Sequence, residues 1–258
     1  MRNLEILTKS VNTLNKHLLA GETITRVCLD EYAKMCFCYT SQHRLLCFDY
    51  NSEAAMTIKH TVDMKDENPN LESSELVMIA FVQEFGGVSL AYKVGNMYTV
   101  KFGGSTPVVE EVGEIPDGIL AASWAPNQDH LAVATTKLML LLTPEFDVPM
   151  EQALDDDDLT FDQSDKVRDS AIKDACISWR GDSQIFVCTY WINGGRKCLT
   201  RDVSQGMQVT KGPARADNQV VFSVAEKPIP TLALPTCIMP NGSLVTGFQN
   251  RILPNKQI

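Results

Sequence analysis

The sequence repeats one pattern: a short apolar segment ending in Ser-Trp, a polar turn, and a second apolar segment. Residues 119–133 hold one copy, with its tryptophan at Trp124, and residues 174–187 hold another, with Trp179. The two tryptophans are 55 residues apart. A unit that recurs at such a distance restricts the chain to folds built from repeated supersecondary elements.

Weaker relatives of the pattern extend it along the chain. Residues 237–245 match it with Ile238 at the tryptophan position, 59 residues after Trp179, and residues 27–35 form a degenerate relative near the start. A unit of about 40–60 residues with three or four short strands is typical of a β-propeller blade, because one such sheet buries its faces only against neighbouring sheets.

The other apolar segments are four to seven residues long and are separated by Gly, Asn, Asp or Pro clusters. Segments of this length with such turns predict antiparallel strands and hairpins, so the expected fold class is all-β. The expected strands are 35–39 and 45–48, 77–82, 88–92 and 97–102, 131–134 and 138–142, and 185–191.

These strands group into four or five blades of a WD-repeat-type β-propeller, over 21–58, 74–112, 117–150, 173–211 and 229 to the end. The last range stops before a full set of strands, so we expect residues 1–258 to be the N-terminal part of an incomplete propeller. The turn after each tryptophan is polar, so Trp124 and Trp179 are interpreted as packing between blades rather than as ligand contacts. On that interpretation Trp179→Ala costs about 3–5 kcal/mol of stability.

Residues 1–20 carry two conflicting signals. The spacing of the apolar residues is that of an amphipathic helix, whereas several of the same residues are β-branched and neither Gly nor Pro bounds the segment well. The sequence leaves the conformation of this segment open. The apolar positions are Leu4, Leu7, Val11, Leu14 and Leu18.

Charge and composition narrow the class of protein. The net charge of −9 argues against a face that grips nucleic acid by neutralising phosphates over its whole extent. No apolar run approaches eighteen residues, and the N-terminus lacks the apolar core of a secretory signal. We therefore expect an intracellular protein, cytoplasmic with a nuclear location also open.

The eight cysteines lack the paired spacing of a zinc site, since no C-x-x-C occurs and the four histidines are scattered. Cys36 and Cys38 face the same side of a predicted strand, which in principle allows metal binding. Buried free thiols acting as small apolar side chains are the favoured interpretation, and a reducing cytosol keeps them reduced. No metal ligand is assigned.

The sequence contains none of the common catalytic motifs. The sequence lacks G-x-S-x-G, a P-loop, H-E-x-x-H and the kinase set, so no catalytic or cofactor-binding residue is named and no cofactor is expected. The acidic run 155–158 lacks the ligand spacing of a calcium loop and is interpreted as a solvated loop. Basic spots at 196–197 and 211–215 are too sparse to predict nucleic-acid binding.

Several stretches resemble one family, the largest (IKAP-type scaffold) subunit of the Elongator complex. The match at 177–182, Ile-Ser-Trp-Arg-Gly-Asp, is the most specific. The others are 1–4, 117–124 running on to 143–149 and 156–159, and 240–245.

The resemblance implies the first N-terminal propeller of a long scaffold that is not itself an enzyme. It implies that a second propeller and a helical, dimerising region, both missing here, follow in the whole protein. The complex modifies wobble uridines of tRNA, and its chemistry belongs to a different subunit that uses radical SAM and acetyl-CoA. The implied partners are that catalytic subunit, a second WD-repeat subunit, and tRNA through the complex, with direct contact left open.

Three functions are therefore weighed. The first is the Elongator scaffold, the second is a WD-repeat adaptor outside that complex, and the third is an enzyme on a propeller. The third needs carboxylates or histidines converging at one end of a channel, and the sequence shows no such cluster. A propeller alone does not choose between them, because the fold serves many functions.

Overall fold

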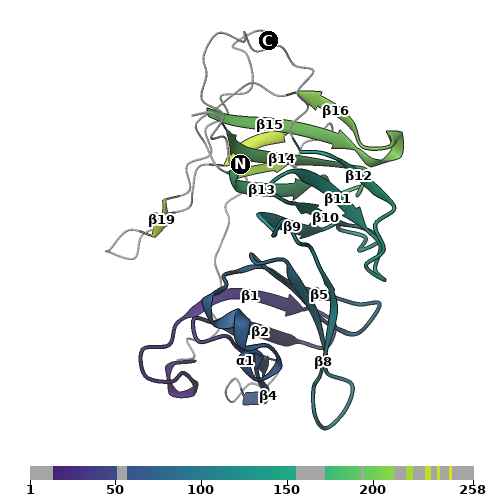
Figure 1. Cartoon of the computed structure of the whole chain (residues 1–258). Helices are drawn as coiled ribbons and strands as arrows, with labels where there is room; N and C mark the ends of the chain where they lie inside the picture. Colours follow the sequence, from purple (N-terminus) through teal and green to yellow (C-terminus); the bar gives the residue numbers. More distant parts are fainter. Residues whose placement is uncertain are drawn as a thin grey trace, which may run out of the picture. The chain divides into compact units, whose positions relative to one another are not determined.

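The structure is a computed structural model, and it describes residues 14–50, 57–154, 172–192, 195–211, 219–222, 230–233, 237–238 and 244–245. Antiparallel β-strands account for nearly all of its regular structure (Figure 1). The helices in the described ranges are single turns, and none has the length and apolar character of a membrane-spanning helix. The predicted all-β class is confirmed.

Sixteen of the strands form four four-stranded sheets, each built from strands consecutive in sequence. The first sheet contains β1 Ile24–Asp30, β2 Met35–Thr40, β3 Arg44–Asp49 and β4 Thr57–Asp63. The second contains β5 Leu76–Val82, β6 Gly87–Tyr92, β7 Asn96–Lys101 and β8 Val108–Glu114. The third contains β9 Ala121–Trp124, β10 Leu131–Ala134, β11 Leu138–Leu142 and β12 Met150–Ala153. The fourth contains β13 Lys173–Trp179, β14 Ile185–Ile192, β15 Gly195–Asp202 and β16 Gln208–Lys211.

These sheets correspond in order to the first four predicted blades, and every strand predicted in them is present. The fourth strands β4, β8 and β12 run past the predicted blade ends at 58, 112 and 150. Four further short strands follow, paired two by two: β17 Gln219–Phe222 with β18 Pro230–Ala233, and β19 Cys237–Ile238 with β20 Leu244–Val245. β17 precedes the range predicted for a fifth blade. Within the weak third copy of the repeat, Ile238 ends β19, as the tryptophans end β9 and β13.

The remaining elements are short helical turns: η1 Leu14–His17, α1 Met64–Glu67, η2 Pro69–Ser73 and η3 Val203–Gln205. Of the N-terminal segment that the sequence left open, residues 14–17 form η1 and residues 1–13 lie outside the described residues. The acidic run 155–158 also lies outside them.

The sheets obey the alternation of a pleated strand, with both faces of the central strands buried. In the first sheet Phe37 pairs with Cys28 on β1 and with Cys47 on β3, so these three side chains share one face. Cys36 and Cys38 project from the opposite face, where they pack with Leu46 and Phe48. Strands buried on both faces read as continuous apolar runs, which is why the sequence located them.

The chain divides into two compact units. Unit 1 contains Met1–Ser74, Ile79–Ser89 and Thr99–Glu110, and unit 2 contains Glu75–Met78, Leu90–Tyr98 and Glu111–Ile258. In unit 1 the Phe37 ring stacks on the Phe81 ring at 5.7 Å and lies 5.0 Å from Phe102. In unit 2 the buried side chains of the third and fourth sheets form one core that includes Trp179, Phe186 and Tyr190.

Candidate interaction site

The first strand of each four-stranded sheet ends in the same turn, and this turn defines the repeat in three dimensions. Four residues after the last strand residue, the backbone enters the left-handed region, at Lys34 (φ 57°), Gly86 (59°), Gln128 (64°) and Ser183 (61°). In the last three turns this residue donates its N–H to the carbonyl three residues earlier, over 2.9–3.1 Å. The corresponding strand ends are Asp30, Val82, Trp124 and Trp179.

Trp179 joins the third sheet to the fourth. It is 8% exposed, and its indole Nε1 donates a 2.8 Å hydrogen bond to the carbonyl of Ser123 on β9. Its ring lies 4.8 Å from Phe186, the residue paired with it on β14. The predicted packing of this tryptophan between blades is confirmed.

Trp124 is also buried, at 9% exposure. Its ring meets the Phe146 ring edge-on at 6.1 Å, and Phe146 belongs to the β11–β12 loop of the same sheet. Its Nε1 has no hydrogen-bond partner among the residues the structure describes. Trp124 is therefore buried, as predicted, but its described ring contact lies within its own sheet and not between two blades.

Two further contacts hold the third and fourth sheets together. The Asn127 N–H, in the turn after β9, donates to the Ser183 hydroxyl, in the turn after β13, over 3.0 Å. Arg201 of β15 is fully buried and donates to Gln152 Oε1 at 2.6 Å and to the Ala153 carbonyl at 2.9 Å on β12. An indole and a hydroxyl thus each make a hydrogen bond between these two sheets.

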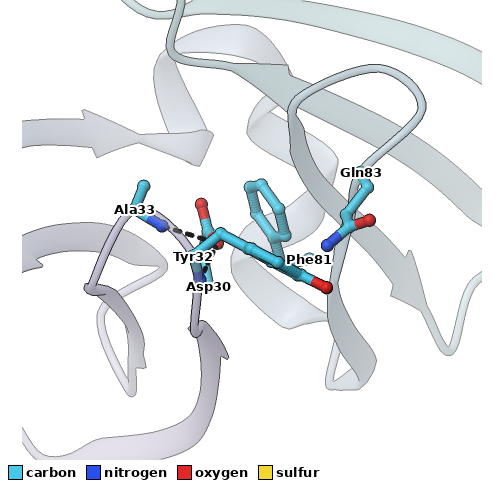
Figure 2. A pocket seen from close by; sticks show the side chains of 5 residues that line it. All are labelled: Asp30, Tyr32, Ala33, Phe81 and Gln83. Carbon is cyan, nitrogen blue, oxygen red and sulfur yellow. Dashed lines mark hydrogen bonds between the residues drawn. The ribbon is translucent and has the colours of Figure 1, made fainter.

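The first two turns carry different residues at these positions, and a pocket lies between them. Val82 stands where Trp179 stands, and Gly86 stands where Ser183 stands, so neither the indole nor the hydroxyl is present. An open pocket at these two turns has a volume of about 420 Å³. We call it the Tyr32 pocket, and the residues that line it, all in unit 1, are Asp30, Tyr32, Ala33, Phe81 and Gln83 (Figure 2).

Asp30 supplies the charge of the Tyr32 pocket. It is 7% exposed, and its Oδ1 accepts the backbone N–H groups of Tyr32 at 2.9 Å and Ala33 at 3.1 Å (Figure 2). No ion pair to Asp30 is present in the part of the chain that the structure describes. Tyr32, in contrast, is 84% exposed and is the most exposed large apolar side chain described.

A second charged group in unit 1 is buried but paired. Glu22 accepts two hydrogen bonds from the Arg44 guanidinium, at 2.9 and 2.5 Å, and one from the Thr40 hydroxyl. The Arg44 hydrogen bonds lower the pKa of the Glu22 carboxyl to about 2, against the raising effect of burial. Arg44 also donates to the His17 carbonyl at 3.1 Å, so this pair ties η1 to the first sheet.

The expected burial of the thiols is present for four of the described cysteines, whereas three are half-buried. The buried ones are Cys36, Cys38, Cys47 and Cys188, and the half-buried ones are Cys28, Cys176 and Cys198. Cys36 Sγ lies 3.7 Å from Cys38 Sγ on the same face of β2. Burial raises the pKa of the Cys28 and Cys47 thiols to about 12. Within the described residues, no three His, Cys, Asp or Glu side chains are grouped so that they fit a metal ion.

None of the residues of the Tyr32 pocket was assigned a role from the sequence. Asp30 and Tyr32 lay inside the degenerate repeat copy at 27–35, and Phe81 inside a predicted strand. The available signal was the turn itself, since Asp30 occupies the tryptophan position with a carboxylate. The basic spot at 196–197 begins on β15, where Arg196 pairs with Trp191.

Comparison with known proteins identifies the family. The family model for the "ELP1 first N-terminal beta-propeller" matches residues 1–170 of the 258. The chain belongs to the Elongator subunit 1 first-propeller family. The predicted family resemblance is confirmed.

Two curated relatives agree with the Elongator family. "Elongator complex protein 1" of Oryctolagus cuniculus is 24% identical over 251 residues, which cover 84% of this chain and 17% of the relative. The protein of the same name from Rattus norvegicus is 26% identical over 185 residues, covering 59% of this chain and 12% of the relative. The chain thus spans less than a fifth of the length of either relative.

Two solved structures share the fold. A crystal structure of a protein from Lactobacillus plantarum superposes with a TM-score of 0.52 and 10% identity, covering 86% of this chain and 70% of that one. The crystal structure of the Cps50 (Swd1) β-propeller domain of Myceliophteria thermophila also has a TM-score of 0.52, with 9% identity, covering 78% and 61%. The predicted WD-repeat-type β-propeller class, with an incomplete set of blades, is confirmed.

Proposed function

We propose that this chain is the propeller part of a non-catalytic scaffold subunit of the Elongator complex. The observation that carries the proposal is the match of residues 1–170 to the Elongator subunit 1 propeller family. In this role the subunit assembles the catalytic subunit with its partners and so supports the modification of wobble uridines in tRNA. The chain itself performs no chemistry.

The fold suits a scaffold because its sheets are joined by fixed contacts. The hydrogen bond from Trp179 to Ser123 and those from Arg201 to Gln152 and Ala153 hold the third and fourth sheets in one arrangement. Loops and turns on such a rigid frame keep their geometry when a partner binds, which reduces the entropy lost on association.

The proposal extends to the full-length Elongator subunit 1. Residues 1–258 are the N-terminal part of the first propeller, and a second propeller and a helical region that forms a homodimer complete the subunit. The partners are the radical-SAM, acetyl-CoA-using subunit and a second WD-repeat subunit, with tRNA bound through the complex. The location is cytoplasmic, with the nucleus as a second site.

Affinity purification of the full-length gene product, tagged at its C-terminus, tests the proposal. Mass spectrometry of the eluate is expected to identify the catalytic subunit and the second WD-repeat subunit. An unrelated tagged propeller protein, expressed at the same level, serves as the control. A folded bait that recovers neither subunit would contradict the scaffold function and favour an adaptor outside Elongator.

A further inference from the structure

The Tyr32 pocket combines a carboxylate with two aromatic rings. Asp30 lines it, and its Oδ1 accepts hydrogen bonds from two backbone N–H groups. Among the described residues, no basic side chain forms an ion pair with Asp30. The pocket therefore contains a carboxyl group that is 7% exposed and that has no described ion-pair partner.

The rings come from a turn of the first sheet and a strand of the second. Tyr32 projects from the β1–β2 turn with 84% of its surface exposed, and Phe81 lines the pocket from β5, held in place by its stack on Phe37. Gln83, from the turn after β5, contributes an amide (Figure 2). The negative face of an aromatic ring attracts a cation.

This combination selects for a cation on an apolar stem. An anion would be repelled by Asp30, and a neutral apolar group would take the carboxylate further from water without supplying an opposite charge, at a cost in free energy. The side chain of lysine or arginine meets both requirements, since its methylene stem packs on rings while its charged end reaches a carboxylate. The chain's net charge of −9 adds a long-range attraction for a basic segment.

We propose that the Tyr32 pocket receives a lysine or arginine side chain from a partner protein. The pocket is open and lies on two turns, so a side chain from a second polypeptide can enter it. The inference that a partner protein supplies this side chain rests on the proposed scaffold function. The inference that the ligand is a cationic side chain rests only on the residues of the pocket.

The first test is an NMR titration of the ¹⁵N-labelled 258-residue chain with three probes. The probes are Nα-acetyl-lysine methylamide, its trimethylated form, and the norleucine analogue, which keeps the stem and lacks the charge. The backbone amides of Tyr32 and Ala33 donate to Asp30 and serve as reporters. Both cationic probes are expected to give saturable shifts with millimolar Kd values, about −4 kcal/mol, and norleucine none.

Variants identify the groups responsible. Asp30→Asn keeps the side-chain oxygen that holds the turn and removes the charge, and it is expected to weaken the lysine probe about tenfold. Glu31→Gln is the matched control, because it removes the same charge one residue away and outside the pocket lining, and it should change Kd less than twofold. If Asp30→Asn fails to fold, Tyr32→Ala, at an exposed position, is expected to weaken binding about threefold. Equal binding of norleucine, unchanged Kd in these variants, or no saturable shift would overturn the proposal.

A second arm separates the pocket from the scaffold function. Full-length wild-type, Glu31→Gln and Asp30→Asn baits are purified in parallel. One partner protein recovered with the wild-type and Glu31→Gln baits is expected to be lost or depleted with the Asp30→Asn bait. Loss of that wild-type partner from Glu31→Gln as well as from Asp30→Asn, or its retention by all three proteins, contradicts the pocket's role in partner binding. A wild type that recovers no Elongator subunit contradicts the scaffold function instead, whatever the titration shows.

Discussion

Trp179 combines a buried ring with a hydrogen bond to the next sheet. We expect Trp179→Ala to lower the free energy of unfolding by about 3–5 kcal/mol, because it leaves a cavity in the shared core. Trp179→Phe keeps most of the ring and loses only the bond to the Ser123 carbonyl, so it should cost about 1–2 kcal/mol. Urea unfolding followed by circular dichroism measures both.

Trp191 provides the matched control, since it is the same residue type on β14 with 37% exposure. Trp191→Phe should change stability by less than about 1 kcal/mol. Equal losses for Trp179→Phe and Trp191→Phe would show that the inter-sheet hydrogen bond contributes nothing.

The lowered pKa of Glu22 predicts that the free energy of unfolding depends on pH. Its carboxyl has a pKa of about 2 in the folded protein, below the ordinary value of 4.5. A lowered folded-state pKa contributes stability that is fully present above pH 4.5 and is lost as the pH falls from 4.5 toward 2. Glu22→Gln removes this contribution and should cost about 2 kcal/mol at pH 7.

The difference in unfolding free energy between wild type and Glu22→Gln, measured from pH 7 to pH 3, checks the sign. It should be constant above about pH 5 and shrink below pH 4.5. Glu75→Gln, which removes an exposed carboxylate from a 3.5 Å ion pair with Lys93, is the control and should show little change. A difference that stays constant to pH 3 would contradict the assignment.

At the scale of the elements, the strands of the hairpins could be predicted from the sequence, whereas one copy of the repeat could not. The strands around Phe37, Val133 and Val187 were predictable because short apolar runs between polar turns have few other solutions. The repeat was recognised at Trp124 and Trp179 and, in weaker form, at 27–35 and 237–245, but the copy ending at Val82 was not. What the four turns share is a left-handed backbone at Lys34, Gly86, Gln128 and Ser183, and these four residues have no chemistry in common.

The Tyr32 pocket could not be predicted for a related reason. Asp30 and Phe81 are distant in sequence and meet only because the first two sheets place their turns together in unit 1.

The β6–β7 turn depends on Gly95. This residue has φ of 115°, and a Cβ there would lie 2.1 Å from the Ile115 carbonyl oxygen. Ile115 also donates its N–H to the Gly95 carbonyl over 3.1 Å, so the two backbones cannot separate without losing that bond. We expect Gly95→Ala to cost about 3 kcal/mol.

Gly103, in the β7–β8 turn, is the control for Gly95. It has an ordinary φ, and a Cβ there would meet no atom within 4 Å. Gly103→Ala should leave the unfolding free energy within about 0.5 kcal/mol of wild type. Thermal unfolding of both variants measures the difference, and a neutral Gly95→Ala would show that the turn can rearrange.

At the scale of the whole molecule, the described cysteines are all free thiols, and those in the first sheet are shielded. The pKa values of about 12 for Cys28 and Cys47 lower their thiolate fraction about a thousandfold relative to an ordinary value of 9.0. We expect iodoacetamide at pH 8 to alkylate these two at least that much more slowly in the native protein than in urea. Mass spectrometry of timed digests measures the rates, and similar native and denatured rates would contradict the burial.

The distribution of tryptophan has a spectroscopic consequence. All three tryptophans, Trp124, Trp179 and Trp191, belong to unit 2, and unit 1 has none. Fluorescence excited at the red edge of the absorption band therefore reports on unit 2 alone, whereas far-ultraviolet dichroism records the strands of both units. Coincident transitions by the two signals would mean that the units unfold together, and separated transitions would assign a stability to each without any substitution.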